Sequence, residues 1–144
     1  MPLGFLGEYE YRIDEKGRLP FPPKYRDRFR DGGVLAQGLE SCIRVYPLAE
    51  WEKVVETMGA LGGNRYKERR LVRFTFGSAF DFELDRQGRV ALPPPLRKFA
   101  DLKESAIVVG LNTHIELWNR ENWNREKDHG AEDAAQISES LENY

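Results

Sequence analysis

Two short segments carry the residues best suited to chemistry, Asp14–Arg18 (DEKGR) and Asp85–Arg89 (DRQGR). Each has an Asp, an Arg four residues later and a Gly directly before that Arg. A Gly adopts positive φ without steric cost and an Asp caps its own turn, so each segment predicts the tight tip of a β-hairpin. Basic side chains at such a tip point to solvent, where they can bind a phosphate or a guanine edge.

The residues alone leave two interpretations of the tips open. In one, Lys16 and Arg18 bind nucleic acid, since a two-stranded ribbon fits the major groove. In the other, Arg18 pairs with Asp14 across the hairpin and the remaining charges are solvated. Arg recurs in both segments although Lys16 becomes Gln87, which indicates that something holds the Arg position more firmly than its neighbours. The Asp–Arg pair would also explain that.

The elements that must position the tips belong to a duplicated unit. A shift of 71 residues, from Asp14 to Asp85, superposes the first strand, the tip and the following proline-opened helix of the two halves. A shift of 72 then superposes the second hairpins, expected at 34–46 and at 106–118. One unit has exposed strand edges and too little core to stand alone, so the two units are predicted to pair. The prediction is an α+β, mainly β fold: a small β-barrel with an approximate internal two-fold axis and short helices.

The predicted boundaries follow from this repeat. They are 5–58 for the first unit, 59–75 for a connecting helix, 76–127 for the second unit and 128–144 for an acidic tail without regular structure. At the end of the first unit a helix is expected with one buried stripe, formed by Leu48, Trp51, Val55 and Met58. In the connecting helix a basic stripe recurs every four residues, at Arg65, Arg69 and Arg73. This stripe is either a second DNA surface or a solvated face.

Composition excludes several classes of protein. Charged residues make up 32% of the 144, and no apolar run reaches the roughly 18 to 20 residues that span a bilayer, which predicts a soluble protein without a membrane partner. The N-terminus lacks the features of a secretion signal, so a cytoplasmic location is expected. The single Cys42 excludes an internal disulfide and is expected in the core. His114 and His129 form no metal-binding pattern, and we predict no enzyme, catalytic residue, metal, cofactor or small-molecule substrate.

The charge distribution bears on how the protein would bind DNA. The net charge is −2, but residues 126–144 hold six acids and one Lys, which leaves 21 bases and 18 acids for residues 1–125. A body with a charge of only +3 would bind a polyanion weakly as a single copy. We therefore expect several copies to bind together and gain from effective concentration.

The repeated Asp-x-x-x-Arg segments, with their surroundings, resemble the MraZ family, a bacterial relative of the AbrB-like swapped-hairpin DNA-binding proteins. The matching segments extend over nearly the whole of residues 4–123: they are 13–19 with Tyr25-Arg26, 83–89 with Leu96-Arg97, 109–111, 115–118 and Trp123. The resemblance implies a sequence-specific transcriptional regulator, typically a repressor, located at the nucleoid. Such a protein binds direct repeats in double-stranded DNA upstream of the division and cell-wall gene cluster that contains its own gene. It also implies a homo-oligomer, typically a ring.

Carried over by motif, the implied DNA-binding residues are Arg12, Lys16, Gly17 and Arg18, with Arg86 and Arg89 as second-unit counterparts; Asp14, Asp85 and Gly88 shape the turns. Pro20 departs from the family's usual strand and puts the geometry of the first tip in question. The alternative function is an oligomeric protein-interaction scaffold that binds no specific DNA and in which the tip arginines are structural.

Overall fold

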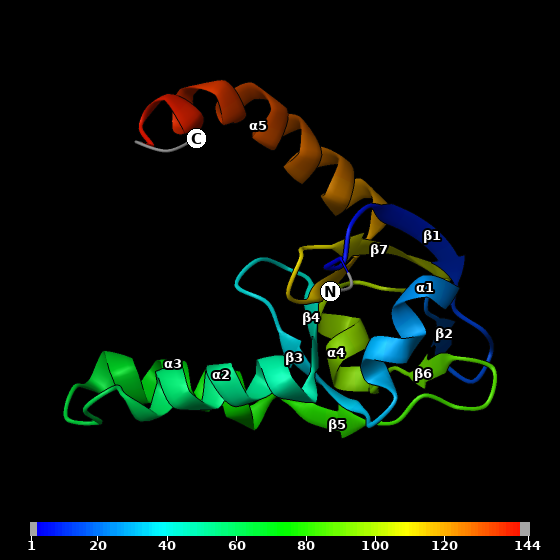
Figure 1. The fold of residues 1–144 in the computed structure, drawn as a ribbon, viewed down its shortest axis with the longest axis horizontal. Coiled ribbons are helices and arrows are strands. Elements are labelled where there is room, and N and C mark those ends of the chain that lie inside the picture. Colours follow the sequence, from blue (N-terminus) through cyan, green and yellow to red (C-terminus); the bar gives the residue numbers. More distant parts are fainter. Residues whose placement is uncertain (1–2, 142–144) are drawn as a thin grey trace.

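The computed structural model describes residues 3–141, which form eight strands and five α-helices. In chain order the elements are β1 (Glu8–Arg12), β2 (Arg18–Pro20), α1 (Pro23–Arg26) with a 3₁₀ turn (Asp27–Phe29), β3 (Gly33–Gln37), β4 (Ile43–Pro47), α2 (Leu48–Gly59), α3 (Tyr66–Gly77), β5 (Phe80–Phe82), β6 (Arg89–Ala91), α4 (Pro94–Phe99), β7 (Ser105–Gly110), β8 (Ile115–Trp118) and α5 (Arg120–Glu139). The fold is α+β, as predicted (Figure 1).

Six strands form one antiparallel sheet in the order β1-β7-β8-β4-β3-β5, and β2 and β6 form a separate antiparallel ribbon. The described strands do not close into the predicted small barrel, because β1 and β5 remain as the two edges of the sheet. Prolines account for the break. Pro22-Pro23 and Pro93–Pro95 follow β2 and β6 and lack the N–H that would extend a ladder, so each ribbon strand ends after three residues.

An internal two-fold axis relates the two units. Each strand of the sheet has a counterpart in the other unit: β1 and β5, β7 and β3, and β8 and β4. Exchanging the counterparts gives the same sheet order read from the other edge. Two pairs of facing residues mark the axis: Leu19 faces Val90 in the ribbon, and Arg44 faces Glu116 in the sheet. In each pair the partners occupy the same position of the repeat. The duplication read from the sequence is therefore a duplication of structure.

The strands that flank the tips pair differently from the prediction. The second hairpin of each unit is confirmed, since β3 pairs with β4 and β7 pairs with β8. The expected first hairpins are wrong: β1 pairs with β7, and β2 pairs with β6 of the other unit. In this exchange of strands between the units, the pairing of β2 with β6 stabilises the fold, because the facing Leu19 and Val90 side chains are both fully buried in the shared core.

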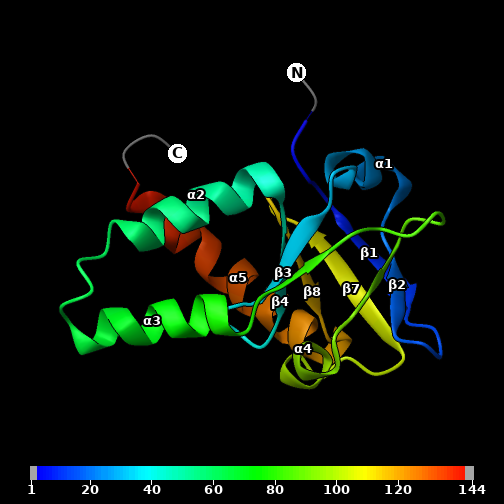
Figure 2. The same ribbon diagram turned by 90° about the horizontal axis from the view of Figure 1, so that it is seen from below.

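The main core lies between the inner face of the sheet and the layer formed by the β2–β6 ribbon, α1 and α4 (Figure 1 and Figure 2). The central strands β4 and β8 supply fully buried branched side chains, and the ribbon supplies Leu19 and Val90. Phe29 is at the centre of an aromatic cluster, with ring centroids 5.5 Å from Phe5, 5.2 Å from Phe21 and 5.7 Å from Phe82. Both units therefore share one core.

A smaller cluster covers the outer face of the sheet. Trp123 of α5 packs there against Cys42, Ile107, Val109 and Trp118. Cys42 is fully buried, as predicted, and burial raises the pKa of its thiol. On the same sheet Tyr46 contacts Trp51 of α2, which in turn contacts Phe76 of α3.

The helices depart from the sequence prediction in two places. In α2 no residue is fully buried; Trp51 and Met58 are half-buried and Val55 is exposed, so the stripe covers less surface than expected. The predicted absence of regular structure after residue 127 is wrong as far as Glu139, because α5 runs to that residue. Residues 142–144 of the predicted tail lie outside the described part of the chain, and the unit boundaries stay a prediction.

The start of α5 explains why this helix forms. The Asn119 side chain caps it by accepting a hydrogen bond from the Asn122 N–H at 3.1 Å. Trp123 and Lys127 then bind Glu8 of β1. Within residues 3–141, no helix combines the length and the apolar character needed to cross a bilayer.

The aromatic cluster leads to a stability prediction. Phe29→Ala should lower the free energy of unfolding by about 3 to 5 kcal/mol, because it opens a cavity among three other rings. The matched Phe80→Ala should cost clearly less, since Phe80 is 39% exposed on the edge strand β5. Chemical denaturation of both variants measures the difference, and equal losses would contradict the placement of the core.

Candidate nucleic-acid interface

The two Asp–Arg segments form the same turn twice. In the first turn the Asp14 N–H donates to the Arg18 carbonyl at 3.0 Å, and the Gly17 N–H donates to the Asp14 carbonyl at 2.9 Å. The second turn repeats both bonds, each at 2.9 Å. Gly17 and Gly88 have φ angles of +78° and +75°, a left-handed conformation that glycine adopts without a steric penalty.

Each turn is closed by its Asp carboxylate. Asp14 Oδ1 accepts from the N–H groups of Lys16 at 3.0 Å and Arg18 at 2.9 Å, and its Oδ2 accepts from Arg18 Nε at 2.7 Å. Asp85 makes the equivalent bonds to the Gln87 and Arg89 N–H groups and to Arg89 Nε. The backbone N–H of the Arg is the largest cause that lowers the pKa of each carboxyl. The ionised Asp therefore fixes both the turn and the Arg that follows it.

Each turn is also held by the other unit. The Gly17 carbonyl accepts from the Leu92 N–H at 2.9 Å, and the Gly88 carbonyl accepts from the Phe21 N–H at 3.0 Å. Two arginines related by the repeat lie over the glycines. A Cβ on Gly88 would be 2.2 Å from Arg26 Nε, and a Cβ on Gly17 would be 3.1 Å from Arg97 Nη1. Each tip is thus bonded to the other unit, and these reciprocal contacts of Gly17 and Gly88 are called the interlock.

Sequence reasoning missed these two arginines as part of the site. Arg26 Nε donates to the Phe21 carbonyl at 3.0 Å, and Arg97 Nη2 donates to the Lys103 carbonyl at 2.9 Å. A signal was present, because Arg26 and Arg97 superpose under the same shift of 71 as the turns. Their contact across the units could be seen only once the strand exchange was known.

The structure divides the six predicted DNA-binding residues into three kinds. Arg12, Lys16 and Arg86 are exposed, and within residues 3–141 they form no ion pair. Gly17 is buried in the turn. The last two are tied to the turn aspartates, with side chains 32% exposed for Arg18 and 21% for Arg89.

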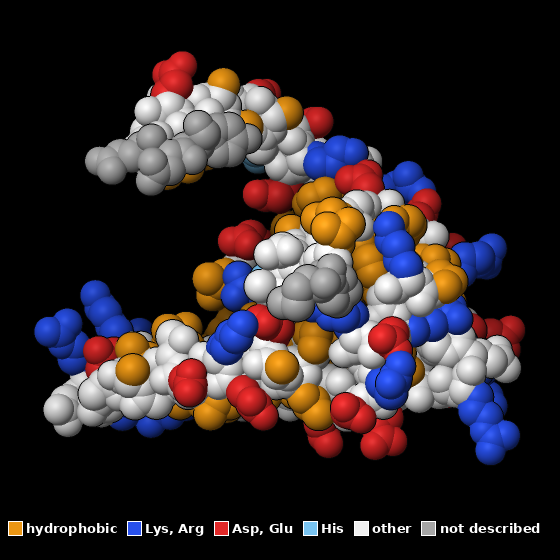
Figure 3. Space-filling model, in the orientation of Figure 1, with side chains coloured by type: hydrophobic (Ala, Val, Ile, Leu, Met, Phe, Trp, Pro, Cys, Tyr) orange, Lys and Arg blue, Asp and Glu red, His pale blue; other side chains and the backbone are white. Residues whose placement is uncertain are grey.

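The two turns meet through a shared carboxylate. Arg89 Nη1 lies 3.6 Å from Asp14 Oδ2, which already accepts from Arg18. Figure 3 shows Lys and Arg side chains at the end of the molecule that carries β1, β2 and β6, interspersed with acids. The surface there is a set of separate cations rather than one continuous basic field.

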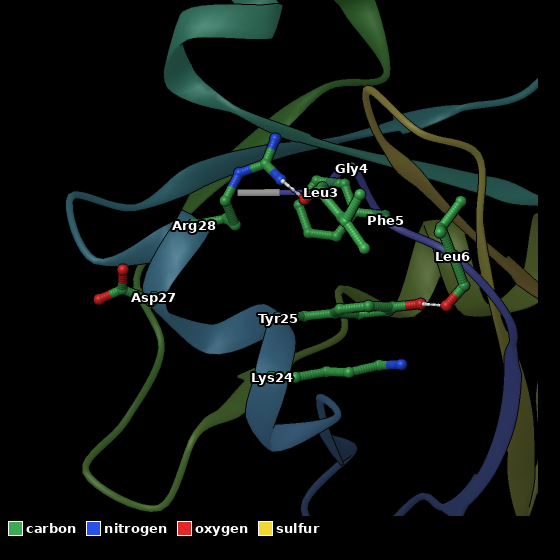
Figure 4. A pocket seen from close by; sticks show the side chains of 8 residues that line it. All are labelled: Leu3, Gly4, Phe5, Leu6, Lys24, Tyr25, Asp27 and Arg28. Carbon is green, nitrogen blue, oxygen red and sulfur yellow. Dashed lines mark hydrogen bonds between the residues drawn. The ribbon is translucent and has the colours of Figure 1, made fainter. Parts of the chain in front are cut away.

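A cavity of about 320 Å³ beside α1 has a structural role (Figure 4). The Tyr25 hydroxyl donates to the Leu6 carbonyl across it. Lys24 lies over the Tyr25 ring at 5.7 Å, and Arg28 lies over the Phe5 ring at 4.3 Å. The Tyr25–Leu6 bond and the Arg28–Phe5 contact therefore hold the N-terminal segment against α1 and the 3₁₀ turn.

The fold and the two turns define a class of protein: a duplicated α+β chain whose units exchange strands and each present one Asp–Arg turn. The chain belongs to the MraZ family. The profile of that family, described as "MraZ protein, putative antitoxin-like", matches residues 5–74 and again residues 75–141.

Curated relatives agree with the profile. Two proteins from strains of Dehalococcoides mccartyi are 46% and 48% identical to the chain; the alignments cover 97% and 96% of this chain and 99% and 98% of theirs. A protein from Pediococcus pentosaceus is 38% identical over 95% of this chain and 96% of its own length. All three are named transcriptional regulator MraZ.

The close approach at the turns predicts an order of stabilities. Gly88→Ala and Gly17→Ala should each destabilise the protein by about 1 to 3 kcal/mol through the left-handed backbone. The loss should be larger for Gly88, because its Cβ would clash with Arg26 at 2.2 Å. Gly59→Ala is the control, since nothing lies within 4 Å of its Cβ position. Thermal denaturation gives the order, and a Gly88 variant as stable as the Gly59 variant would contradict the interlock.

The turn carboxylates predict a pH dependence. Their pKa values are lowered in the folded state, so their stabilising contribution is present above the unfolded pKa and is lost as pH falls through the folded pKa. Asp14→Asn/Asp85→Asn keeps an oxygen that can cap each turn but removes the charge that holds the Arg. The melting temperature of this variant should lie below that of the parent at neutral pH, and the gap should narrow in acid. A gap of constant size from neutral to acid pH would show that the charges do not contribute.

Proposed function

We propose that the protein is a transcriptional regulator that binds DNA through its first tip. The observation that carries the proposal is the similarity to relatives named transcriptional regulator MraZ, which are 46% and 48% identical to the chain over nearly its full length. The geometry of the first tip supports it, because Lys16 is exposed on a turn that hydrogen-bonds to the other unit, and Arg12 is exposed at the end of β1 just before that turn. A rigid turn has little conformational entropy to lose on binding.

In this proposal Arg18 has two roles. Its Nε bonds to Asp14, while its two Nη groups are left for a phosphate or a guanine edge. Lys16, at the end of the turn, contacts the phosphate backbone as a point charge. The buried Gly17 contributes by letting the turn form, not through a side chain.

The second tip is expected to contribute less. Gln87 stands where the first tip has Lys16, and Glu83 stands where it has Arg12, so two cations are lost, while Arg86 replaces Glu15 as the exposed base. Arg89 is nearer to two carboxylates, since it bonds to Asp85 and lies 3.6 Å from Asp14. We assign Arg86 and Arg89 a supporting role beside the first tip.

The remaining parts of the proposal concern target and assembly. Several copies, arranged as a ring, place their first tips on direct repeats of double-stranded DNA. The operator lies upstream of the division and cell-wall gene cluster that includes the gene of this protein, and occupancy represses that cluster at the nucleoid. The weak charge of the body supports the need for several copies, because each one alone would release few counterions.

A charge deletion at the tip tests the proposal. Lys16→Ala should weaken binding to DNA from upstream of the gene and should reduce the slope of log K against log salt by about 0.9 for each phosphate that the variant no longer neutralises. Its melting temperature should stay unchanged, because the Lys16 side chain is exposed and only its backbone N–H caps the turn. Fluorescence anisotropy over a range of salt concentrations measures the affinity and the slope.

Lys98→Ala is the matched control. Lys98 is an exposed lysine on α4 that belongs to neither tip, does not line the groove between α2 and α3, and forms no ion pair within residues 3–141. This variant should bind DNA as the parent does. If Lys16→Ala also binds as the parent does, the tips are structural and the scaffold alternative is favoured.

A further inference from the structure

Helix α5 leaves the body of the molecule after its first two turns. Those turns are held by Glu8, which accepts from Trp123 Nε1 and from Lys127 Nζ at 3.0 Å each. From Asp128 to Glu139 every residue except Ser138 is exposed, and Figure 1 shows the helix extending past the sheet. A helix in water is stabilised mainly by packing of an amphipathic face. The described part of this chain offers no such contact to the outer half of α5.

The outer half of α5 has a narrow apolar face. Gly130, Ala134 and Ile137 recur at intervals of four and three residues, and Leu141 continues the row just past the last turn. Ile137 and Leu141 are 57% and 54% exposed. Gly and Ala would let another element approach the helix axis closely. Residues 128–139 hold four acids and no Lys or Arg, so this segment is also strongly acidic.

A groove of complementary character lies elsewhere on the chain. It has a volume of about 470 Å³, lies between α2, α3 and the β3–β4 hairpin, and is lined by apolar residues that include Leu39, Met58, Leu71 and Phe74. Leu39 is 66% exposed and Leu71 is 38% exposed. The charged side chains that line it are two cations, Arg44 and Lys53, and one acid, Glu50. Outside the lining, α3 adds Lys67, Arg69, Arg70 and Arg73 against Glu68. An acidic helix with an apolar face matches this surface in both charge and polarity.

We propose that the outer half of α5 docks into the α2–α3 groove of a second copy of the chain. Its own groove is a poor alternative, because α5 and the α2–α3 hairpin extend from the body as two separate arms (Figure 1) and the bonds of Glu8 to Trp123 and Lys127 keep α5 in that direction. The mode is an amphipathic helix in an apolar groove, with Arg44 and Lys53 of the groove as the cations that face the acids of α5.

The contact joins two different surfaces, so each copy donates one helix and accepts one. Such heterologous contacts form a ring if the rotation closes and a filament if it does not. The inference deepens the proposed function by assigning the contact between its copies, but it concerns association without DNA. It also assigns the groove between α2 and α3 to a second copy of the chain.

The test uses two adjacent alanines of α5 in the full-length protein without DNA. Ala134→Arg places a charge in the apolar face and should weaken self-association by about a hundredfold or more. Ala135→Arg adds the same side chain about 100° further round the helix and should associate as the parent does. Sedimentation velocity over a range of protein concentrations measures both.

A groove variant completes the test. Leu71→Arg should also abolish self-association, with Leu39→Arg as a second groove variant if the first lowers the melting temperature. An equimolar mixture of Ala134→Arg and Leu71→Arg should form a 1:1 dimer, because one copy keeps its helix and the other keeps its groove.

Three results would overturn the inference. They are a parent protein that stays monomeric at every concentration, an Ala134→Arg variant that associates normally, and groove variants that associate although Ala134→Arg does not. The last would indicate pairing of α5 with α5. DNA binding that fails while association follows the expected pattern would overturn the proposed function alone.

Discussion

Two reciprocal backbone hydrogen bonds hold the two units together at the end that carries the Asp–Arg turns. The Leu92 N–H donates to the Gly17 carbonyl, and the Phe21 N–H donates to the Gly88 carbonyl. Each bond joins a turn glycine, held at a positive φ that glycine adopts without a steric penalty, to a residue of the other unit. Neither tip can therefore take this form in an isolated unit. The duplicated core, the strand exchange and the presentation of Lys16 all depend on this constraint.

The Asp of each turn solves an electrostatic problem that a DNA-binding tip would otherwise have. A carboxylate beside a phosphate-binding lysine would repel the same phosphate. Asp14 is bonded to Arg18 and lies 3.6 Å from Arg89, so two guanidinium groups offset its charge. The carboxylate can then cap the turn while the exposed Lys16 keeps its charge unpaired within residues 3–141. In the proposed function, structural and binding roles thus fall to the same few side chains.

Local patterns predicted the repeat, the second hairpins and the proline-opened helices, because each depends on residues close in sequence. They could not predict the strand exchange, since β1 alternates in the same way whichever strand it pairs with. Nor could they predict α5: its outer half is acidic and rich in small residues, a composition typical of disorder. The Asn119 cap and the contacts of Trp123 and Lys127 with Glu8 fix its start, and Glu8 lies on a strand distant in sequence.

For the site, the sequence identified the turn residues but left the role of Arg18 open between folding and binding. The structure explains why both interpretations were reasonable, because Asp14 occupies Nε and leaves the Nη groups. A comparison of the two turns distinguishes the positions that folding needs from those that it leaves free. The positions that the interlock needs, Asp, Gly and Arg, are the same in both units, whereas Lys16 faces solvent and is replaced by Gln87 in the second. A position that the fold leaves free is the one where two copies of a unit can diverge, so the difference between the tips lies where a difference in DNA contact would be expected.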